Sequence, residues 1–417
     1  MSGILTFIFL AFTTQPFLST ETAIDQFQKE TINYLDSDLD NCLFRINQSI
    51  TASQDLDYDY GEAYGLYLKA YVHRTQDDLG KAFVVNLKAL SILNAMMTSR
   101  AIDTKVRLYL NSGEILKKHF KYDEAIQYYK EGLEIAQNNN LENWVIDLQY
   151  NIGNAYRGKG DLSNAFDYIH RAYTRAIPRD DEHTVVNALN IMGLIFKDNG
   201  SHDTARFYFQ KMLTYDYHKL NENKYRGRAY HNIANTYGQV MEYDKAEVAF
   251  KKALNEKRIK NRPKEVFITE IDLAELYHQM GRLEDADRLA KACVSKYDHI
   301  GLDPDYYKIF DLQRKISSDL ERFEELDFYA NRYVEESTKF VAQQEELIRI
   351  RDQFKMEILT ASFFVELERN NRISYLNQII IMLLMTVIVI LLVFKCAQVL
   401  SKRSLEKEIK RALGKTP

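Results

Sequence analysis

Asparagines in the middle of the chain are the side chains whose type and spacing suggest chemistry. They form three pairs whose members lie three residues apart: Asn151 with Asn154, Asn187 with Asn190, and Asn232 with Asn235. Residues at this spacing share one face of a helix. A side-chain amide offers one acceptor and two donors, so such a face can pair with the backbone of an extended peptide. The pattern indicates non-covalent recognition.

No reactive constellation accompanies these asparagines. The sequence lacks H-E-x-x-H, G-x-x-x-x-G-K-[ST], G-x-G-x-x-G and G-x-S-x-G. Its nine histidines are scattered without metal-ligand spacing, and its three cysteines are widely separated. We therefore expect no enzymatic activity, no cofactor and no metal. The net charge of -4 also argues against direct binding of nucleic acid.

The elements that must position the asparagines are helices, arranged as a repeat. Only 5 prolines and 16 glycines interrupt the chain. A small residue recurs every 40 to 43 residues: Ala70, Gly113, Gly153, Gly193, Ala234 and Ala274. An alanine follows each of them by twelve residues: Ala82, Ala125, Ala165, Ala205, Ala246 and Ala286. Glycines between the two helices of a unit, such as Gly160, Gly200 and Gly281, allow a positive φ. One hairpin cannot bury its apolar face alone, so the units must stack into a solenoid.

The repeat resembles the tetratricopeptide repeat (TPR) family. Residues 151–173 and 232–254 carry its order of Asn-x-small, aromatic, Gly, Ala and small residues. The resemblance covers about residues 60–300 and fades at both ends, so we expect an all-α, TPR-like solenoid of helix hairpins over residues 24–336. The period of about 40 exceeds the usual one of about 34 residues. Longer helices of this kind resemble those of bacterial signalling TPR proteins that bind peptides or regulators.

The resemblance implies that the first helix of each hairpin lines a concave groove for a protein or peptide ligand. The groove residues would then be Asn111, Tyr150, Asn151, Asn154, Arg157, Asn187, Asn190, Lys197, Arg228, His231, Asn232, Asn235 and His278. The family also places asparagine two residues before the small residue for structural hydrogen bonds. That alternative accounts equally well for Asn111, Asn151 and Asn232. The lysines of a chaperone-type carboxylate clamp are missing, because Tyr150 and His231 stand at the first lysine position.

Segments near the two ends predict export and a membrane span. Residues 1–22 match a secretory signal peptide with a short apolar run at 4–12. Residues 374–396 contain an uncharged run of about 19 residues, which as a helix spans about 28 Å, close to the hydrocarbon core of a bilayer. The basic tail at 397–417 should stay cytoplasmic. We expect a single-pass membrane protein with a periplasmic solenoid and the lipid bilayer as a partner.

Residues 337–373 predict a helical stalk between the solenoid and the span. Phe340, Leu347 and Phe354 lie seven apart, which fits a coiled-coil seam for a homodimer and equally a capping helix that packs back onto the repeats. The arrangement resembles the sensor halves of TPR-containing histidine kinases and regulators of Bacteroidetes-type bacteria, without their output domain. The implied function is membrane-anchored protein or peptide recognition, as a sensory or signalling accessory. Two alternatives stay open: a cytosolic, tail-anchored TPR adaptor, and a scaffold subunit of an envelope or secretion complex.

Overall fold

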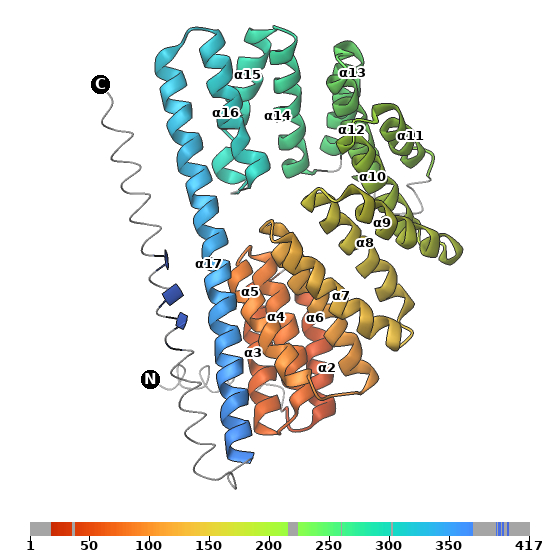
Figure 1. Ribbon diagram of the computed structural model, residues 1–417, viewed down its shortest axis with the longest axis vertical. Helices are drawn as coiled ribbons and strands as arrows, with labels where there is room; N and C mark the ends of the chain where they lie inside the picture. Colours follow the sequence, from red (N-terminus) through yellow and green to blue (C-terminus); the bar gives the residue numbers. More distant parts are fainter. Residues whose placement is uncertain are drawn as a thin grey trace, which may run out of the picture. The chain divides into compact units, whose positions relative to one another are not determined.

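The computed structural model describes residues 18–35, 38–215, 224–259, 261–301 and 303–369, and a few positions between 389 and 399. Throughout these residues the regular elements are helices (Figure 1). The sequence-based prediction of an all-α, TPR-like solenoid is therefore confirmed. The chain divides into two compact units, Met1–Arg351 and Asp352–Pro417.

The α-helices follow one another as hairpins. The pairs are α2 (Glu21–Thr31) with α3 (Leu39–Asp55), α4 (Asp59–Thr75) with α5 (Leu79–Leu93), α6 (Ser99–Lys118) with α7 (Tyr122–Asn138), α8 (Glu142–Lys159) with α9 (Leu162–Ala176), α10 (Glu182–Asp198) with α11 (His202–Met212), α12 (Lys224–Gln239) with α13 (Tyr243–Ile259), α14 (Pro263–Gln279) with α15 (Leu283–Val294), and α16 (Pro304–Asp319) with α17 (Phe323–Arg369). Three short 3-10 turns lie at Ile32–Tyr34, Ile177–Arg179 and Tyr297–His299.

Small residues of the repeat stand where the two helices of a hairpin touch. A Cβ atom on Gly113 would come within 2.3 Å of the Tyr129 ring, and one on Gly193 within 2.4 Å of Phe209. Both rings are fully buried. The bulky residue that follows the repeat alanine therefore fills the space that the small residue leaves open, and this contact sets the distance between the helices.

The turns inside the hairpins use a left-handed residue, as the glycine positions predicted. Gly160, Gly200 and Gly281 have φ values of 88°, 76° and 72°. In other hairpins Asp77 and Phe120 take the same conformation, with φ of 63° and 60°. The turns of these hairpins thus share one geometry, and glycine adopts it without the steric strain that a side chain causes.

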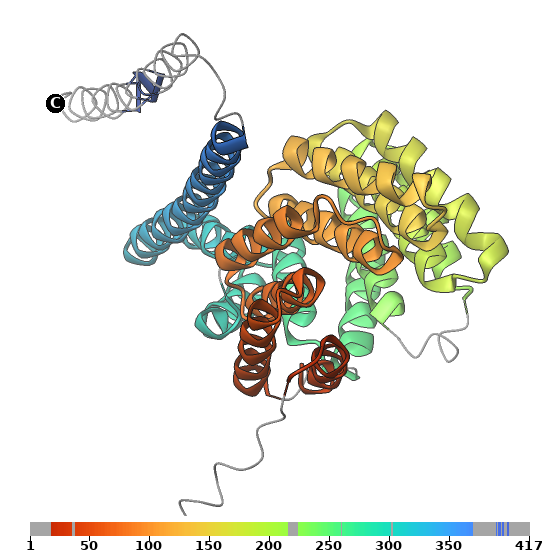
Figure 2. The ribbon, with the colours of Figure 1, turned by 90° about the horizontal axis from the view of Figure 1, so that it is seen from below.

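The first helices of the hairpins form the inner surface of the solenoid. From α4 to α14, each of them packs against its own partner and against the first helix of the next hairpin. Within the described residues the second helices do not form a comparable continuous series. The first helices are therefore the more closely spaced layer, and closer spacing on one side curves a stack of hairpins towards that side, which makes it the concave side. Figure 2 shows the hairpins following one another in the order of their colours.

The last helix, α17, returns to the beginning of the solenoid. The Phe340 ring lies 5.7 Å from that of Phe120 between centroids, and Leu347 is only 2% exposed. Arg351 forms an ion pair with Glu124 at 3.2 Å. Residues 323–351 thus pack on repeats that lie some two hundred residues earlier, and they cap the solenoid. The coiled-coil seam and the homodimer built on it are not supported, because Phe340 and Leu347 are covered by the protein's own repeats.

The predicted membrane helix and the single-pass membrane location are contradicted. Across the helices that the structure describes, none is both long enough and apolar enough to cross a bilayer. The longest of these, α17, carries charged side chains along its whole length. The expected span at 374–396 lies outside the described residues except for a few positions. Residues 1–17 of the expected signal peptide also lie outside them, as does the tail 397–417 apart from two positions.

Candidate functional site

A cavity of about 450 Å³ lies among the first helices α10, α12, α14 and α16. Because these helices form the concave layer, the cavity belongs to the predicted groove. Four of the predicted groove residues line it: Lys197, His231, Asn232 and Asn235. The other lining residues are Gly238, Gln239, Phe250, Ile268, Asp272, Glu275, Leu276, Gln279, Asp305 and Lys308. Most of these side chains are polar, which suits a polar or peptidic ligand better than an apolar one.

His231 is the centre of a hydrogen-bonded network in this cavity. Its Nδ1 lies 3.1 Å from Thr269 Oγ1, and its Nε2 lies 3.2 Å from Asp272 Oδ2. The Nδ2 of Asn235 lies 3.1 Å from the same Nε2. Burial lowers the pKa of His231, and nearby ammonium groups act in the same direction against the attraction of Asp272. The ring thus lies between Thr269, Asp272 and Asn235 and links the three side chains in one network.

Asp272 and Lys308 form the charged pair of the cavity. Their atoms Oδ1 and Nζ are 2.9 Å apart, and the Asp272 side chain is only 12% exposed. Burial acts to raise the pKa of Asp272, but the hydrogen bonds and charges of His231 and Lys308 outweigh it and hold the pKa below its usual range. The carboxylate is thus ionised and fixed, so it can receive a hydrogen bond from a ligand without reorganising.

Three of the predicted asparagines serve the architecture of the repeats. Asn111 accepts a hydrogen bond from Arg74 at 3.0 Å, and Asn151 donates to the Asp147 carbonyl at 2.9 Å. Asn232 donates to Asn190 Oδ1 at 2.7 Å. Each of the three is at most 8% exposed. The structural alternative expects hydrogen bonds to neighbouring backbone, and among these three contacts only that of Asn151 is to a backbone carbonyl.

The structural alternative did not explain four pair members; Asn190 is buried, whereas Asn154, Asn187 and Asn235 are more accessible. Asn154, in α8, and Asn235, in α12, are half-buried. Asn154 makes no hydrogen bond to another described residue, and it does not line the cavity. Asn235 does line it, and its side-chain oxygen has no hydrogen-bond partner among the described residues.

The remaining predicted residues are engaged elsewhere. Asn187 accepts a hydrogen bond from Arg228 at 3.3 Å. Arg157 and His278 are bonded to acidic residues of the following hairpin, and Tyr150 packs among the buried residues between hairpins. None of these five lines the cavity. The cavity therefore brings together Lys197, His231, Asn232 and Asn235 of the predicted groove residues, and the rest of the predicted groove stays a prediction.

Sequence reasoning missed Asp272 and Lys308. Asp272 stands two residues before the small residue Ala274, the same register position as Asn232. A search by position rather than by residue type would have found it. Lys308 lies in the degenerate last repeat, where Arg314 replaces the small residue and no local signal marks the register.

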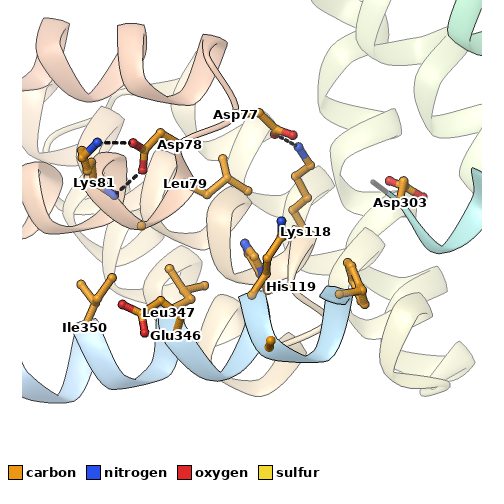
Figure 3. Close-up of a pocket in the computed structure, with 14 residues that line it drawn as sticks. Asp77, Asp78, Leu79, Lys81, Lys118, His119, Asp303, Glu346, Leu347 and Ile350 are labelled. Atoms are coloured by element: carbon orange, nitrogen blue, oxygen red, sulfur yellow. Dashed lines mark hydrogen bonds and ion pairs between the residues drawn. The ribbon is translucent and has the colours of Figure 1, made fainter. Parts of the chain in front are cut away.

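A second cavity, of about 730 Å³, lies where α17 meets α5 and the end of α6. Figure 3 shows His119 there, near Leu79 and the α17 residue Leu347. His119 is 7% exposed, and neither ring nitrogen has a hydrogen-bond partner among the described residues. Burial lowers its pKa to about 4, and the adjacent Lys118 ammonium adds to this effect. The ring is therefore neutral at pH 7.

Helix hairpins with this packing define a TPR-type domain. Residues 88–290 match the family model described as the SusR N-terminal TPR domain. The resemblance to the sensor halves of histidine kinases is not confirmed by this match. No curated protein matches the sequence significantly.

Three solved structures share the fold. The Rap protein complexed with competence and sporulation factor is 13% identical, with a TM-score of 0.54, over 77% of this chain and 99% of that one. The Rap conjugation gene regulator of plasmid pLS20, in complex with the Phr* peptide, is 11% identical, with a TM-score of 0.54, over 78% and 97%. Aspartyl phosphate phosphatase F from Bacillus subtilis is 13% identical, with a TM-score of 0.54, over 76% and 94%. At these identities the likeness is one of fold.

Proposed function

We propose that this protein recognises a peptide, or an extended segment of a protein, in the cavity among α10, α12, α14 and α16. The observation that carries the proposal is the convergence of one polar side chain from each of these four helices. They are Lys197, Asn235, Asp272 and Lys308. Hydrogen-bonding groups spread along a concave surface fit a ligand that is itself a chain of donors and acceptors.

The amide of Asn235 is the group best placed to pair with a ligand backbone. Its nitrogen lies 3.1 Å from His231 Nε2, and its oxygen, which has no partner among the described residues, can accept a hydrogen bond from a peptide N–H. Gln239 and Gln279, which are exposed at the same cavity, add two further amides. We propose binding without catalysis, since the cavity is lined by amides, charged side chains and apolar side chains.

The similar structures agree with this proposal. The names of two of them state that they hold a bound factor or peptide. A shared fold at low identity does not carry the ligand across, so the proposal depends on the cavity of this chain. The protein would have a signalling role if a second protein responded to the binding of a ligand in the cavity.

A random-peptide display library selected on the full-length protein tests the proposal. Affinities of the selected peptides would be measured by fluorescence polarisation for the protein and for an Asn235→Ala variant. Loss of one hydrogen bond to the ligand should weaken binding by roughly tenfold while leaving the melting temperature nearly unchanged. Asn138→Ala, an exposed position at the end of the outer helix α7, is the matched control and should bind as the wild type does.

Two results would contradict the proposal. The first is a library that yields no binder. The second is an Asn235→Ala variant that loses stability but keeps its affinity, because Asn235 would then be a structural residue like Asn232.

A further inference from the structure

A basic residue stands four positions after the small residue in five of the repeats. These residues, which we name the basic ladder, are Arg74, Lys117, Arg157, Lys197 and His278. They occupy the carboxyl-terminal ends of the first helices α4, α6, α8, α10 and α14. The end of a helix favours a positive charge because the last carbonyl groups carry a partial negative charge.

Four members of the basic ladder are bonded to the first helix of the following hairpin. Arg74 is bonded to Asn111 and Glu114, Lys117 to Asn151 at 3.3 Å, Arg157 to Asp198 at 2.7 Å, and His278 to Asp319 at 2.7 Å. The next repeat thus supplies an oxygen for each of them. The ladder is part of the packing between hairpins.

Lys197 is the exception. It has no hydrogen-bond or ion-pair partner among the described residues. Lys117 donates to the amide oxygen of Asn151 in the next repeat, and the equivalent residue for Lys197 is Asn232. Among the described residues Lys197 makes no such bond to Asn232, whose amide nitrogen donates to Asn190 Oδ1 at 2.7 Å. Lys197 lines the cavity among α10, α12, α14 and α16.

The surroundings of Lys197 do not replace the missing partner. Burial lowers the pKa of its ammonium, and the charges of Arg157 and Lys308 lower it as well, although Asp198 and Asp272 oppose them. Asp272 is already bonded to Lys308 and His231. A partly desolvated cation without an acceptor is unfavourable, and an anion placed beside it removes that cost.

We infer that Lys197 binds a carboxylate of the peptide ligand. The inference rests on the proposed function and names the chemistry of the ligand at one position. Glu275 and Asp305 line the same cavity and would repel further acidic groups. One carboxylate beside Lys197 is therefore expected, and it can come from an acidic side chain or from the carboxyl terminus of the peptide.

Two peptide libraries separate these sources. One presents peptides with a free carboxyl terminus, and the other fuses that terminus to the display protein. A side-chain carboxylate predicts enrichment of Asp or Glu at one position in both libraries. A terminal carboxylate predicts binders from the free-terminus library alone.

A double-mutant cycle then tests the contact. A selected peptide is compared with its analogue in which the carboxylate is replaced by an amide, on the wild type and on Lys197→Met. The amide should bind the wild type roughly tenfold to hundredfold more weakly, whereas Lys197→Met should hardly distinguish the two peptides. Lys264→Met, an exposed lysine at the start of α14, is the control and should discriminate as the wild type does. Thermal melting should show Lys197→Met to be no less stable than the wild type, because Lys197 makes no bond within the described residues.

Equal binding of acid and amide peptides by the wild type would overturn the inference, even if the lysine variant could not be produced. So would unchanged discrimination by a folded Lys197→Met. Peptides that bind without any acidic preference would leave the proposed function standing and refute only the contact at Lys197. Failure of both libraries to yield a binder would refute the proposed function and the inference together.

Discussion

Acidification should destabilise the protein through His119. The ring is buried where α17 meets α5 and α6, and its pKa of about 4 lies below the ordinary value of 6.5. The unfolded chain therefore takes up a proton on this side chain at a higher pH than the folded protein does. Because the unfolded state binds more protons in this window, stability must fall as the pH drops from 6.5 towards 4.

The size of the effect follows from the two pKa values. At pH 5 the unfolded imidazole is almost fully protonated, whereas about a tenth of the folded molecules carry the proton. The corresponding loss between pH 7 and pH 5 is about 2 kcal/mol. The buried position of the ring, 7% exposed, means that solvent screening reduces this value only modestly.

Guanidinium denaturation of the wild type and of His119→Leu at pH 7 and pH 5 measures this loss of stability. The variant removes the titrating group and two buried nitrogens that lack partners, so it should match or exceed the wild type at pH 7 and lose about 2 kcal/mol less on acidification. His299→Leu, an exposed histidine, is the control and should follow the wild type. Parallel losses in the wild type and in His119→Leu would refute the reasoning, since other carboxylates and histidines contribute equally to both.

Two further predictions concern packing. Gly113→Ala should destabilise the protein by about 1 to 3 kcal/mol in denaturant titrations, because the added methyl group meets the buried Tyr129 ring; an unchanged midpoint would contradict the hairpin contact. Phe340→Ala should speed hydrogen exchange in residues 340–351 of α17 by roughly tenfold or more, because it removes the ring contact with Phe120. Unaltered exchange there would show that α17 is not held by this contact.

The repeat architecture could be predicted because its determinants are local. Gly113 and Tyr129 lie sixteen residues apart; a small residue recurs at the first position in every repeat, and a bulky one at the second in most of them. Gly160 marked the turn between two helices, and its φ of 88° is the conformation for which glycine is suited. Periodicity of this kind arises from contacts within one hairpin and from contacts between neighbouring hairpins.

The repeat pattern could not predict contacts between residues that lie far apart in the sequence. The heptad spacing of Phe340 and Leu347 allowed a dimer seam or a cap, and only the position of Phe120 in space decides for the cap. Lys308 could not be placed because its repeat lacks the small residue that sets the register. The hydropathy of residues 374–396 predicted a membrane span, and the described helices do not contain one.

Photo-crosslinking of a selected peptide tests the central claim of the account, recognition on the concave surface, most directly. A benzophenone amino acid would replace Gln239, which lines the cavity, or Phe207, which is 59% exposed on the outer helix α11. The account predicts that the peptide is captured at position 239 and not at position 207. Capture at position 207 with none at position 239 would place the ligand on the outer face and contradict it.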